Sequence, residues 1–285
     1  MFENVAVAVD EHDGGQDPVA LAKKLVSSDG KLTLVHVVVG EKKSASDAAL
    51  AHRRPERERT LDWLAALRDE SRADAQVACV EAASVARGLH ELVASRHLDL
   101  LVIGSSGRDQ FGGVFGGDDT RDTLEEAPCV VAVAPAGYAT YQPLALTKVG
   151  VAYDGAAGSA RALAMARSLA AEHGSNLSAF QAVGAPHYVH DRWAVQTELN
   201  DAVKDSRERL AELGQVEPHV EFGDAVEELT RFGASVDLLV VGSHKHRPMD
   251  HLAMRRTTGQ RLAADAPCPL LVLAPTERAA AVADE

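Results

Sequence analysis

Short apolar runs alternate along the chain with longer stretches whose apolar residues recur at helical spacing. The runs are continuous segments rich in Val, Leu and Ile, which is typical of strands buried on both faces of a parallel sheet. In the first half the pattern predicts strands over residues 5–9, 32–39, 76–80, 99–103 and 129–134. Helices are predicted between them over residues 18–27, 47–71, 85–97 and 118–126. Because strand–helix alternation requires right-handed crossovers, we expect an α/β fold with helices on both faces of the sheet.

The second half of the chain repeats the pattern of the first. Strands are predicted there over residues 148–153, 176–183, 218–222, 237–241 and 270–274, with helices between them. Three sequence blocks recur in the same order: Val5–Asp10 as Val149–Asp154, Leu98–Ser105 as Val236–Ser243, and Ala127–Cys129 as Ala266–Cys268. A repeat of this length is a whole domain rather than one turn of a solenoid. We therefore predict two tandem Rossmann-like domains, each a five-stranded parallel sheet, over residues 1–137 and 146–278, separated near Gly137–Pro143.

Composition and charge narrow the class of protein. The chain is 46% hydrophobic and 25% charged, which is globular, and its three cysteines cannot form a framework of paired disulfides. Its 42 acidic and 29 basic side chains give a net charge of −13, so we expect no nucleic-acid partner and no attraction to an anionic membrane. No apolar run is long enough to cross a bilayer, and the N-terminus lacks the basic region of a signal peptide. These features predict a cytoplasmic protein.

The candidate ligand site lies at the carboxyl ends of the strands in the first domain, because open parallel sheets bind ligands where the strand order reverses. The first predicted strand is followed by Asp10, and the fourth by Gly104, Gly107 and, after nine residues, Gly117. Glycines let a backbone approach a ligand closely, and the N-terminus of a following helix offers unpaired amides to an anion. Most Gly-rich loops are simply turns, so it is the position of this one, between a strand and a helix, that indicates a phosphate site.

This Gly-x-x-Gly, nine residues, Gly arrangement closely resembles the nucleotide-binding motif of the universal stress proteins, which belong to the adenine-nucleotide α-hydrolase-like superfamily. Other elements of the chain resemble the same family, namely Asp10, Asp154-Gly155, His36-Val37, Phe222-Gly223-Asp224 and the two Ala-Pro-Cys segments. The resemblance covers nearly all of both halves, so the chain looks like a tandem universal stress protein. That family includes members that bind ATP and members that bind no nucleotide.

The resemblance implies specific roles for residues of the first domain. Asp10 and Val37 would contact adenine and ribose, and the phosphates would be held by Gly104, Gly107 and Gly117. The departure is Asp118, which stands where the family has Ser or Thr. As a plain helix N-cap an aspartate is unremarkable, but it competes with a triphosphate for the same amides unless Mg²⁺ bridges the two. This departure from the family motif therefore favours adenosine or AMP over ATP in this domain.

The second domain departs further from the family motif. Counted forward from Gly242, Lys245 occupies the position of the second glycine, and Arg255-Arg256 that of the Gly-Ser pair. Counted back from Pro267, the pair becomes Arg256-Thr257. Lys and Arg can bind phosphate, but a side chain in place of a close-approach glycine more often fills the pocket. We interpret the second site as degenerate.

Catalytic and metal-binding motifs are weak or missing in the sequence. There is neither a Gly-x-Ser-x-Gly elbow nor a phosphate-loop lysine motif, so we expect no enzymatic activity. Five histidines fall in predicted loops without paired cysteines, and we expect no metal at them: His187, His190, His244, His246 and His251. Cys129 and Cys268 precede apolar strands and are interpreted as buried structural thiols.

The sequence thus predicts a noncatalytic stress-response regulator that binds ATP or AMP in its first domain. Two alternatives stay open, a nucleotide-free protein-interaction scaffold and a slow nucleotide hydrolase. The amphipathic stretches 47–71 and 190–213 are potential partner surfaces, although such faces usually cover the sheet. The family resemblance further implies that the last strands of the two halves pair as an intramolecular pseudo-dimer, and homodimerisation is also open.

Overall fold

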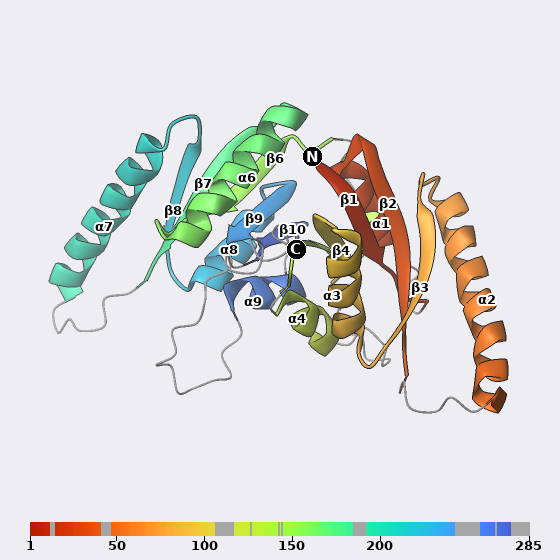
Figure 1. Cartoon of the computed structure of the whole chain (residues 1–285). Coiled ribbons are helices and arrows are strands. Elements are labelled where there is room, and N and C mark those ends of the chain that lie inside the picture. The colour runs from red at the N-terminus through yellow and green to blue at the C-terminus, as the bar shows by residue number, and fades with distance from the viewer. Residues whose placement is uncertain are drawn as a thin grey trace. The chain divides into compact units, whose positions relative to one another are not determined.

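The computed structural model describes residues 1–11, 15–40, 47–105, 117–125, 127–141, 143, 145–184, 192–242, 257–265 and 267–274. The chain divides into two compact units, Met1–Gln142 and Pro143–Pro275. Each unit is a parallel sheet with helices packed against it (Figure 1). The predicted α/β class and the duplication of the fold are therefore confirmed.

The first unit has the strand order β3-β2-β1-β4-β5, and its neighbouring strands are parallel. Its elements are β1 (Phe2–Ala8), α1 (Gln16–Leu25), β2 (Val26–Val39), α2 (Asp47–Glu70), β3 (Gln76–Ala82), α3 (Val85–Arg96), β4 (Leu100–Gly104), α4 (Gly117–Leu124), β5 (Val130–Ala134) and α5 (Tyr138–Tyr141). A hydrogen bond from Lys23 Nζ to the Ser71 carbonyl (2.7 Å) ties α1 to the end of α2. On the other face α3 packs against α4, where His90 Nε2 lies 2.9 Å from the Thr123 carbonyl.

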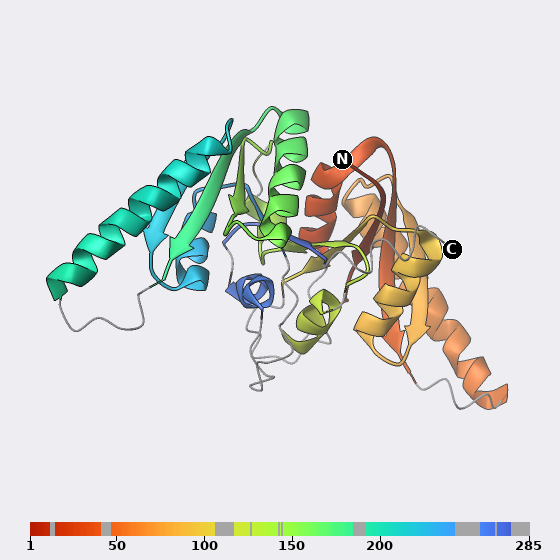
Figure 2. The same ribbon diagram turned by 60° about the vertical axis from the view of Figure 1, so that its left-hand side comes forward.

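The second unit repeats this order as β8-β7-β6-β9-β10, again with parallel neighbours. Its elements are β6 (Lys148–Ala152), α6 (Ala157–His173), β7 (Asn176–Val183), α7 (Arg192–Glu212), β8 (Glu217–Phe222), α8 (Ala225–Gly233), β9 (Leu238–Gly242), α9 (Thr258–Asp265) and β10 (Leu270–Leu273). The two sheets have the same topology because the two halves of the sequence carry the same order of apolar runs. Figure 2 shows the long helices α2 and α7, each lying beside the edge strand of its own sheet.

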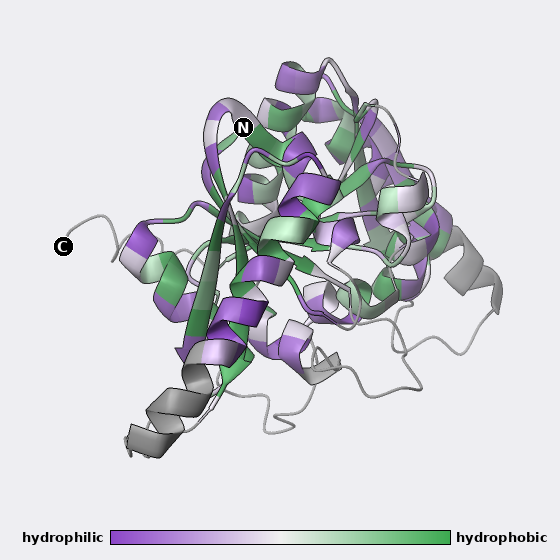
Figure 3. Ribbon diagram, turned by 90° about the vertical axis from the view of Figure 1, so that its right-hand side faces the viewer, coloured by the Kyte–Doolittle hydropathy of each residue, from purple (hydrophilic) through white to green (hydrophobic). Residues whose placement is uncertain are grey.

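The central strands form the core of each unit. Val5, Val7 and Leu101 in the first unit, and Val151 and Leu239 in the second, are fully buried. The strands are largely hydrophobic, whereas the helices carry hydrophilic and hydrophobic residues side by side (Figure 3). Helices on both faces of the sheet bury strands made of continuous apolar runs, as the sequence pattern indicates.

The amphipathic helices α2 and α7 cover the outer strands of their sheets. In α2, Leu64 and Leu67 are buried, and the helix packs on β2 and β3. In α7, Leu210 is buried, and the helix packs on β7 and β8. The apolar residues of the two predicted amphipathic stretches therefore serve, at these positions, to cover the sheet.

Two local predictions in the first unit were wrong. The predicted helix over 18–27 ends at Leu25, and the strand predicted from residue 32 begins at Val26. Parallel pairing of Val26 with Phe2 and of Lys31 with Asn4, with a register shift between them, extends β2 through polar residues of low strand propensity. The short helix α5 was not predicted, and it is held by Asp17, whose carboxylate accepts from the Gly137 amide (2.7 Å) and the Ala139 amide (2.6 Å).

A repeated aspartate fixes the amino-terminal edge of each sheet. Asp99 accepts hydrogen bonds from the amides of Glu3 (2.7 Å) and Asn4 (3.0 Å) at the start of β1. Asp237 does the same in the second unit, accepting from the amides of Thr147 (2.7 Å) and Lys148 (2.9 Å). The recurring aspartate of the two Leu-Leu-Val blocks is therefore structural, and it lies at the edge opposite the candidate ligand site.

Candidate functional site

The candidate site of the first unit lies where the strand order reverses, between β1 and β4. Val7 pairs with Val102, so the carboxyl ends of the two strands reach the same edge of the sheet. Asp10 follows β1 and is only 3% exposed. A carboxylate this deeply buried requires polar partners. Gly104 ends β4 at the same edge.

Helix α4 is attached to this edge. It begins at Gly117, and the Thr120 hydroxyl lies 3.4 Å from the Gly104 carbonyl. Asp118 belongs to the first turn of the helix. The structure thus brings Asp10, Gly104 and the start of α4 to one edge, while Gly107 lies outside the described residues.

Val37 lies one strand away, in β2, and the residue is only 3% exposed. The side chain packs beneath α3, where a Cβ atom added to Gly88 would lie 2.8 Å from Val37 Cγ1. Such a contact is too close, so Gly88 provides the space that Val37 occupies.

The corresponding aspartate of the second unit is part of a closed turn. Asp154 Oδ1 accepts from the Ala156 amide (3.0 Å), and the Asp154 amide donates to the Ser159 hydroxyl (3.3 Å). Gly155 adopts a φ of +82°, which favours glycine. Only residues 153–156 separate β6 from α6, whereas residues 9–15 separate β1 from α1. The shorter connection brings the start of α6 directly onto the edge of the sheet.

Gly242, at the end of β9, is needed for this helix–strand contact. A Cβ atom at this position would lie 2.3 Å from the carbonyl oxygen of Gly158 and 2.9 Å from the amide nitrogen of Ser159. Both atoms belong to the backbone of α6 and cannot rotate away. In this unit the glycine after the fourth strand therefore accommodates a helix of the protein itself.

The N-terminus of α9 is capped by side chains of its own helix. The Thr257 hydroxyl accepts from the Gln260 amide (3.2 Å), and Gln260 Oε1 accepts from the Thr257 amide (2.9 Å), which is a capping box. Thr257 is thus the residue that precedes the helix. Lys245 and Arg255-Arg256 lie outside the described residues.

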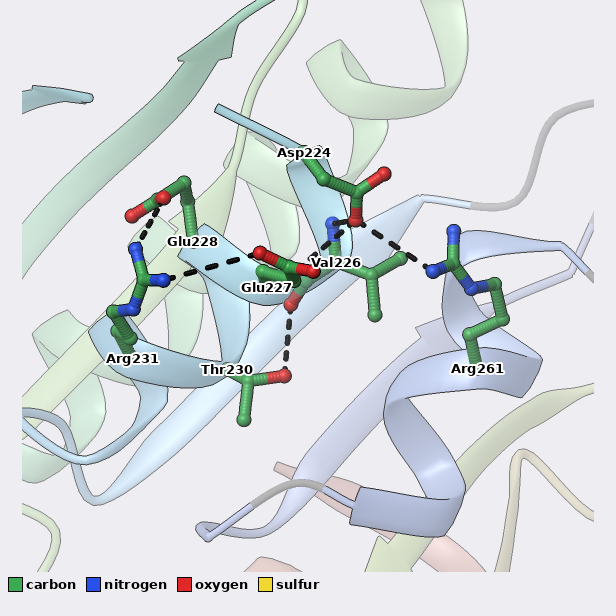
Figure 4. Close-up of polar contacts among 7 residues, drawn as sticks. All are labelled: Asp224, Val226, Glu227, Glu228, Thr230, Arg231 and Arg261. Carbon is green, nitrogen blue, oxygen red and sulfur yellow. Dashed lines mark hydrogen bonds and ion pairs between the residues drawn. The ribbon is translucent and has the colours of Figure 1, made fainter. Parts of the chain in front are cut away.

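The N-terminus of α8 is closed in the same way (Figure 4). Asp224 Oδ1 accepts from the amides of Val226 (3.0 Å) and Glu227 (3.2 Å), and Arg261 of α9 lies 3.6 Å from the same oxygen. Farther along α8, Arg231 forms ion pairs with Glu227 and Glu228. Amides of both helix starts are therefore satisfied by protein groups.

The sequence model of the universal stress protein family matches residues 1–135 and again residues 146–274. The chain belongs to the universal stress protein family. Comparison with curated proteins gave no match.

Solved structures share the fold of this universal stress protein over nearly its whole length. A universal stress protein from Archaeoglobus fulgidus is 17% identical, with a TM-score of 0.65, over 95% of this chain and 98% of that chain. A functionally unknown protein from Pseudomonas aeruginosa PAO1 is 16% identical, with a TM-score of 0.63, over 99% of this chain and 95% of that chain. At these identities the similarity establishes the fold alone.

Sequence reasoning missed two features of the universal stress protein's edges. The contact between Gly242 and α6 had no local signal, because it joins segments far apart in the sequence. The capping box could have been predicted from Thr257 and Gln260, because their three-residue spacing is typical of this motif.

Among the residues that the structure describes, no group of three or more His, Cys, Asp or Glu side chains is placed to hold a metal ion. The five loop histidines all lie outside those residues. No described helix combines the length and the apolar character required to cross a membrane.

The thiols of the universal stress protein are shielded from solvent. Cys268 is buried and Cys129 is half-buried at the residue level. Burial raises the pKa of Cys129 to about 12 and that of Cys268 to about 12. Both groups are therefore neutral thiols at physiological pH, in line with the structural role predicted for them.

The raised thiol pKa values predict a loss of stability in alkaline solution. An unfolded cysteine loses its proton near pH 9, whereas the folded thiols keep theirs until about pH 12. The unfolded state therefore binds fewer protons between these values, and each thiol lowers the free energy of unfolding by about 1.4 kcal/mol per pH unit. Urea unfolding from pH 8 to 11 should show a shallower decline in Cys268→Ala than in the wild type. If the free energy of unfolding falls equally steeply with pH in both proteins, the raised pKa of Cys268 is wrong.

Proposed function

We propose that this universal stress protein is a noncatalytic regulator that binds an adenine nucleotide at the first-unit edge formed by Asp10, Gly104 and the start of α4. The observation that carries the proposal is the buried Asp10 carboxylate beside the end of β4, at the point where the strand order reverses. The helix start at this edge offers backbone amides to a phosphate. The base would lie toward β2, against the backbone of Val37.

The second unit is proposed to bind no nucleotide. Its first helix packs on Gly242, and Thr257 and Gln260 cap the start of α9 with their own hydrogen bonds. A phosphate would have to displace these protein groups before it could bind. The asymmetry between the units favours one nucleotide for each chain.

The charge of α4 favours a ligand with few phosphates. Asp119 lies in its first turn, where a carboxylate interacts favourably with the helix dipole and repels a triphosphate. Oxygen ligands of this kind suit Mg²⁺, which would bridge them to the phosphates. We therefore propose that AMP binds without Mg²⁺ and that ATP requires it.

Calorimetric titration of ATP, ADP and AMP, with and without Mg²⁺, tests this function. We expect saturable binding of one nucleotide per chain. Gly107→Trp, which replaces the second glycine of the motif with a large side chain, should weaken it by about 100-fold. Lys245→Trp places the same bulk at the corresponding position of the second unit and should leave the affinity unchanged. Absence of heat at millimolar ligand would overturn the nucleotide proposal in favour of a protein-interaction scaffold, and catalysed phosphate release would overturn the noncatalytic role.

A further inference from the structure

The backbone ladder between β1 and β2 stops close to Asp10. The Val9 amide still donates to the Val35 carbonyl (2.9 Å), one residue beyond the end of β1. Alternate residues of a strand direct their backbone groups to the same neighbour, so Val37 directs its N–H and C=O toward β1, as Val35 does. In a continued parallel ladder the Val37 amide would donate to the Val9 carbonyl.

A side chain takes that position instead. His36 Nδ1 lies 2.9 Å from the Val9 carbonyl oxygen. A carbonyl only accepts hydrogen bonds, so Nδ1 carries the proton and donates, in both the neutral and the charged ring. Among the described residues no hydrogen bond joins the Val37 amide to Val9. The ring of His36 thus occupies the acceptor that the ladder would offer to Val37.

The orientation of the His36 ring is fixed by packing. Trp63 of α2 meets it edge to face, with ring centroids 5.8 Å apart and an interplanar angle of 83°. Trp63 is itself held by the adjacent Leu64, which is fully buried between α2 and the sheet. The imidazole is therefore held between a helix anchored on the sheet and the last peptide of β1.

We infer that His36 is a positioning residue for the ligand edge of the first unit. Its hydrogen bond to Val9 holds the peptide that leads into Asp10, and it keeps the Val37 amide directed at the ligand position and unpaired with β1. A nucleobase bound there presents acceptor nitrogens that this amide can bind. The inference rests on the proposed function only for the identity of the ligand, since the geometry belongs to the protein alone.

Two substitutions of His36 separate hydrogen bonding from packing. In His36→Asn the side-chain amide supplies a donor near the position of Nδ1 but loses the contact with Trp63. In His36→Leu the apolar packing is largely kept and the donor is lost. We expect AMP affinity to fall by about tenfold in His36→Leu and much less in His36→Asn. Equal affinities in the wild type and His36→Leu, or a greater loss in His36→Asn, would overturn the inference.

Amide hydrogen exchange of the full-length, nitrogen-15-labelled chain tests the inference without a ligand. In the wild type the Val37 amide should exchange faster than the Val9 amide, which is hydrogen-bonded to the Val35 carbonyl. In His36→Leu the freed Val9 carbonyl should accept from it, and exchange should slow by about tenfold, because the amide gains a hydrogen bond. His36→Asn should resemble the wild type. Equal protection of Val37 in all three proteins would refute the role of His36, whereas failure of the wild type to bind any nucleotide would refute only the proposed function.

Discussion

Gly242→Ala should destabilise the second unit by about 3 kcal/mol or more, which is a large effect for a single added methyl group. The new Cβ atom would lie 2.3 Å from the Gly158 carbonyl oxygen and 2.5 Å from its carbonyl carbon. These are backbone atoms at the start of α6, so relief requires the helix to move away from β9. The movement would also disturb the Asp154 turn, whose amide donates to Ser159 on the same helix.

Urea unfolding followed by circular dichroism measures this effect, and Gly184→Ala is the matched control. Gly184 follows β7 in the same unit, and a Cβ atom there would meet no other atom within 4 Å. The control should change the free energy of unfolding by less than about 0.5 kcal/mol. If Gly242→Ala unfolds at the same urea concentration as Gly184→Ala, the close packing of α6 on β9 is wrong.

The duplicated architecture could be predicted because its signal is spread along the whole sequence. Continuous apolar runs such as 99–103 and 237–241 indicate strands buried on both faces, and the helical stretches between them require parallel pairing. Local strand propensity predicted the wrong start for β2, because pairing with β1 determines where this strand begins. Ser27 and Asp29 have low strand propensity, yet they belong to β2 because β1 pairs with both ends of this segment.

The difference between the two candidate sites could be predicted only in part. Gly104-Ser105 and Gly242-Ser243 follow equivalent strands and look alike in sequence. Gly242 packs closely against the backbone of α6, which follows the short turn through Asp154. Such contacts join residues far apart in the chain, so a local motif does not reveal whether a glycine serves a ligand or a neighbouring helix.

His36 likewise shows that a local motif does not reveal contacts between distant parts of the chain. The sequence places His36 beside Val37 in a strand, as the family resemblance implies, but says nothing of the partner of its ring. That partner is the Val9 carbonyl, on the neighbouring strand. The position of this carbonyl follows from strand pairing rather than from residue type.

Asp237→Ala should lower the stability of the second unit by about 3 kcal/mol, since three hydrogen bonds of about 1 kcal/mol each are lost. The carboxylate accepts from the Thr147 amide (2.7 Å), the Thr147 hydroxyl (2.8 Å) and the Lys148 amide (2.9 Å). All three donors lie at the start of β6, which is the central strand of its sheet. Thermal and urea unfolding of the full chain measure the change.

Asp99→Ala provides the comparison within the same molecule. Among the described residues Asp99 accepts from two amides, those of Glu3 and Asn4, so its removal should cost about 2 kcal/mol in the first unit. Asp237→Asn keeps one acceptor oxygen and should lose less stability than Asp237→Ala. The order of stability loss is therefore expected to be Asp237→Ala, Asp99→Ala and Asp237→Asn. A loss in Asp237→Asn as great as that in Asp237→Ala would mean that the charge, and not the hydrogen bonds, holds the start of β6.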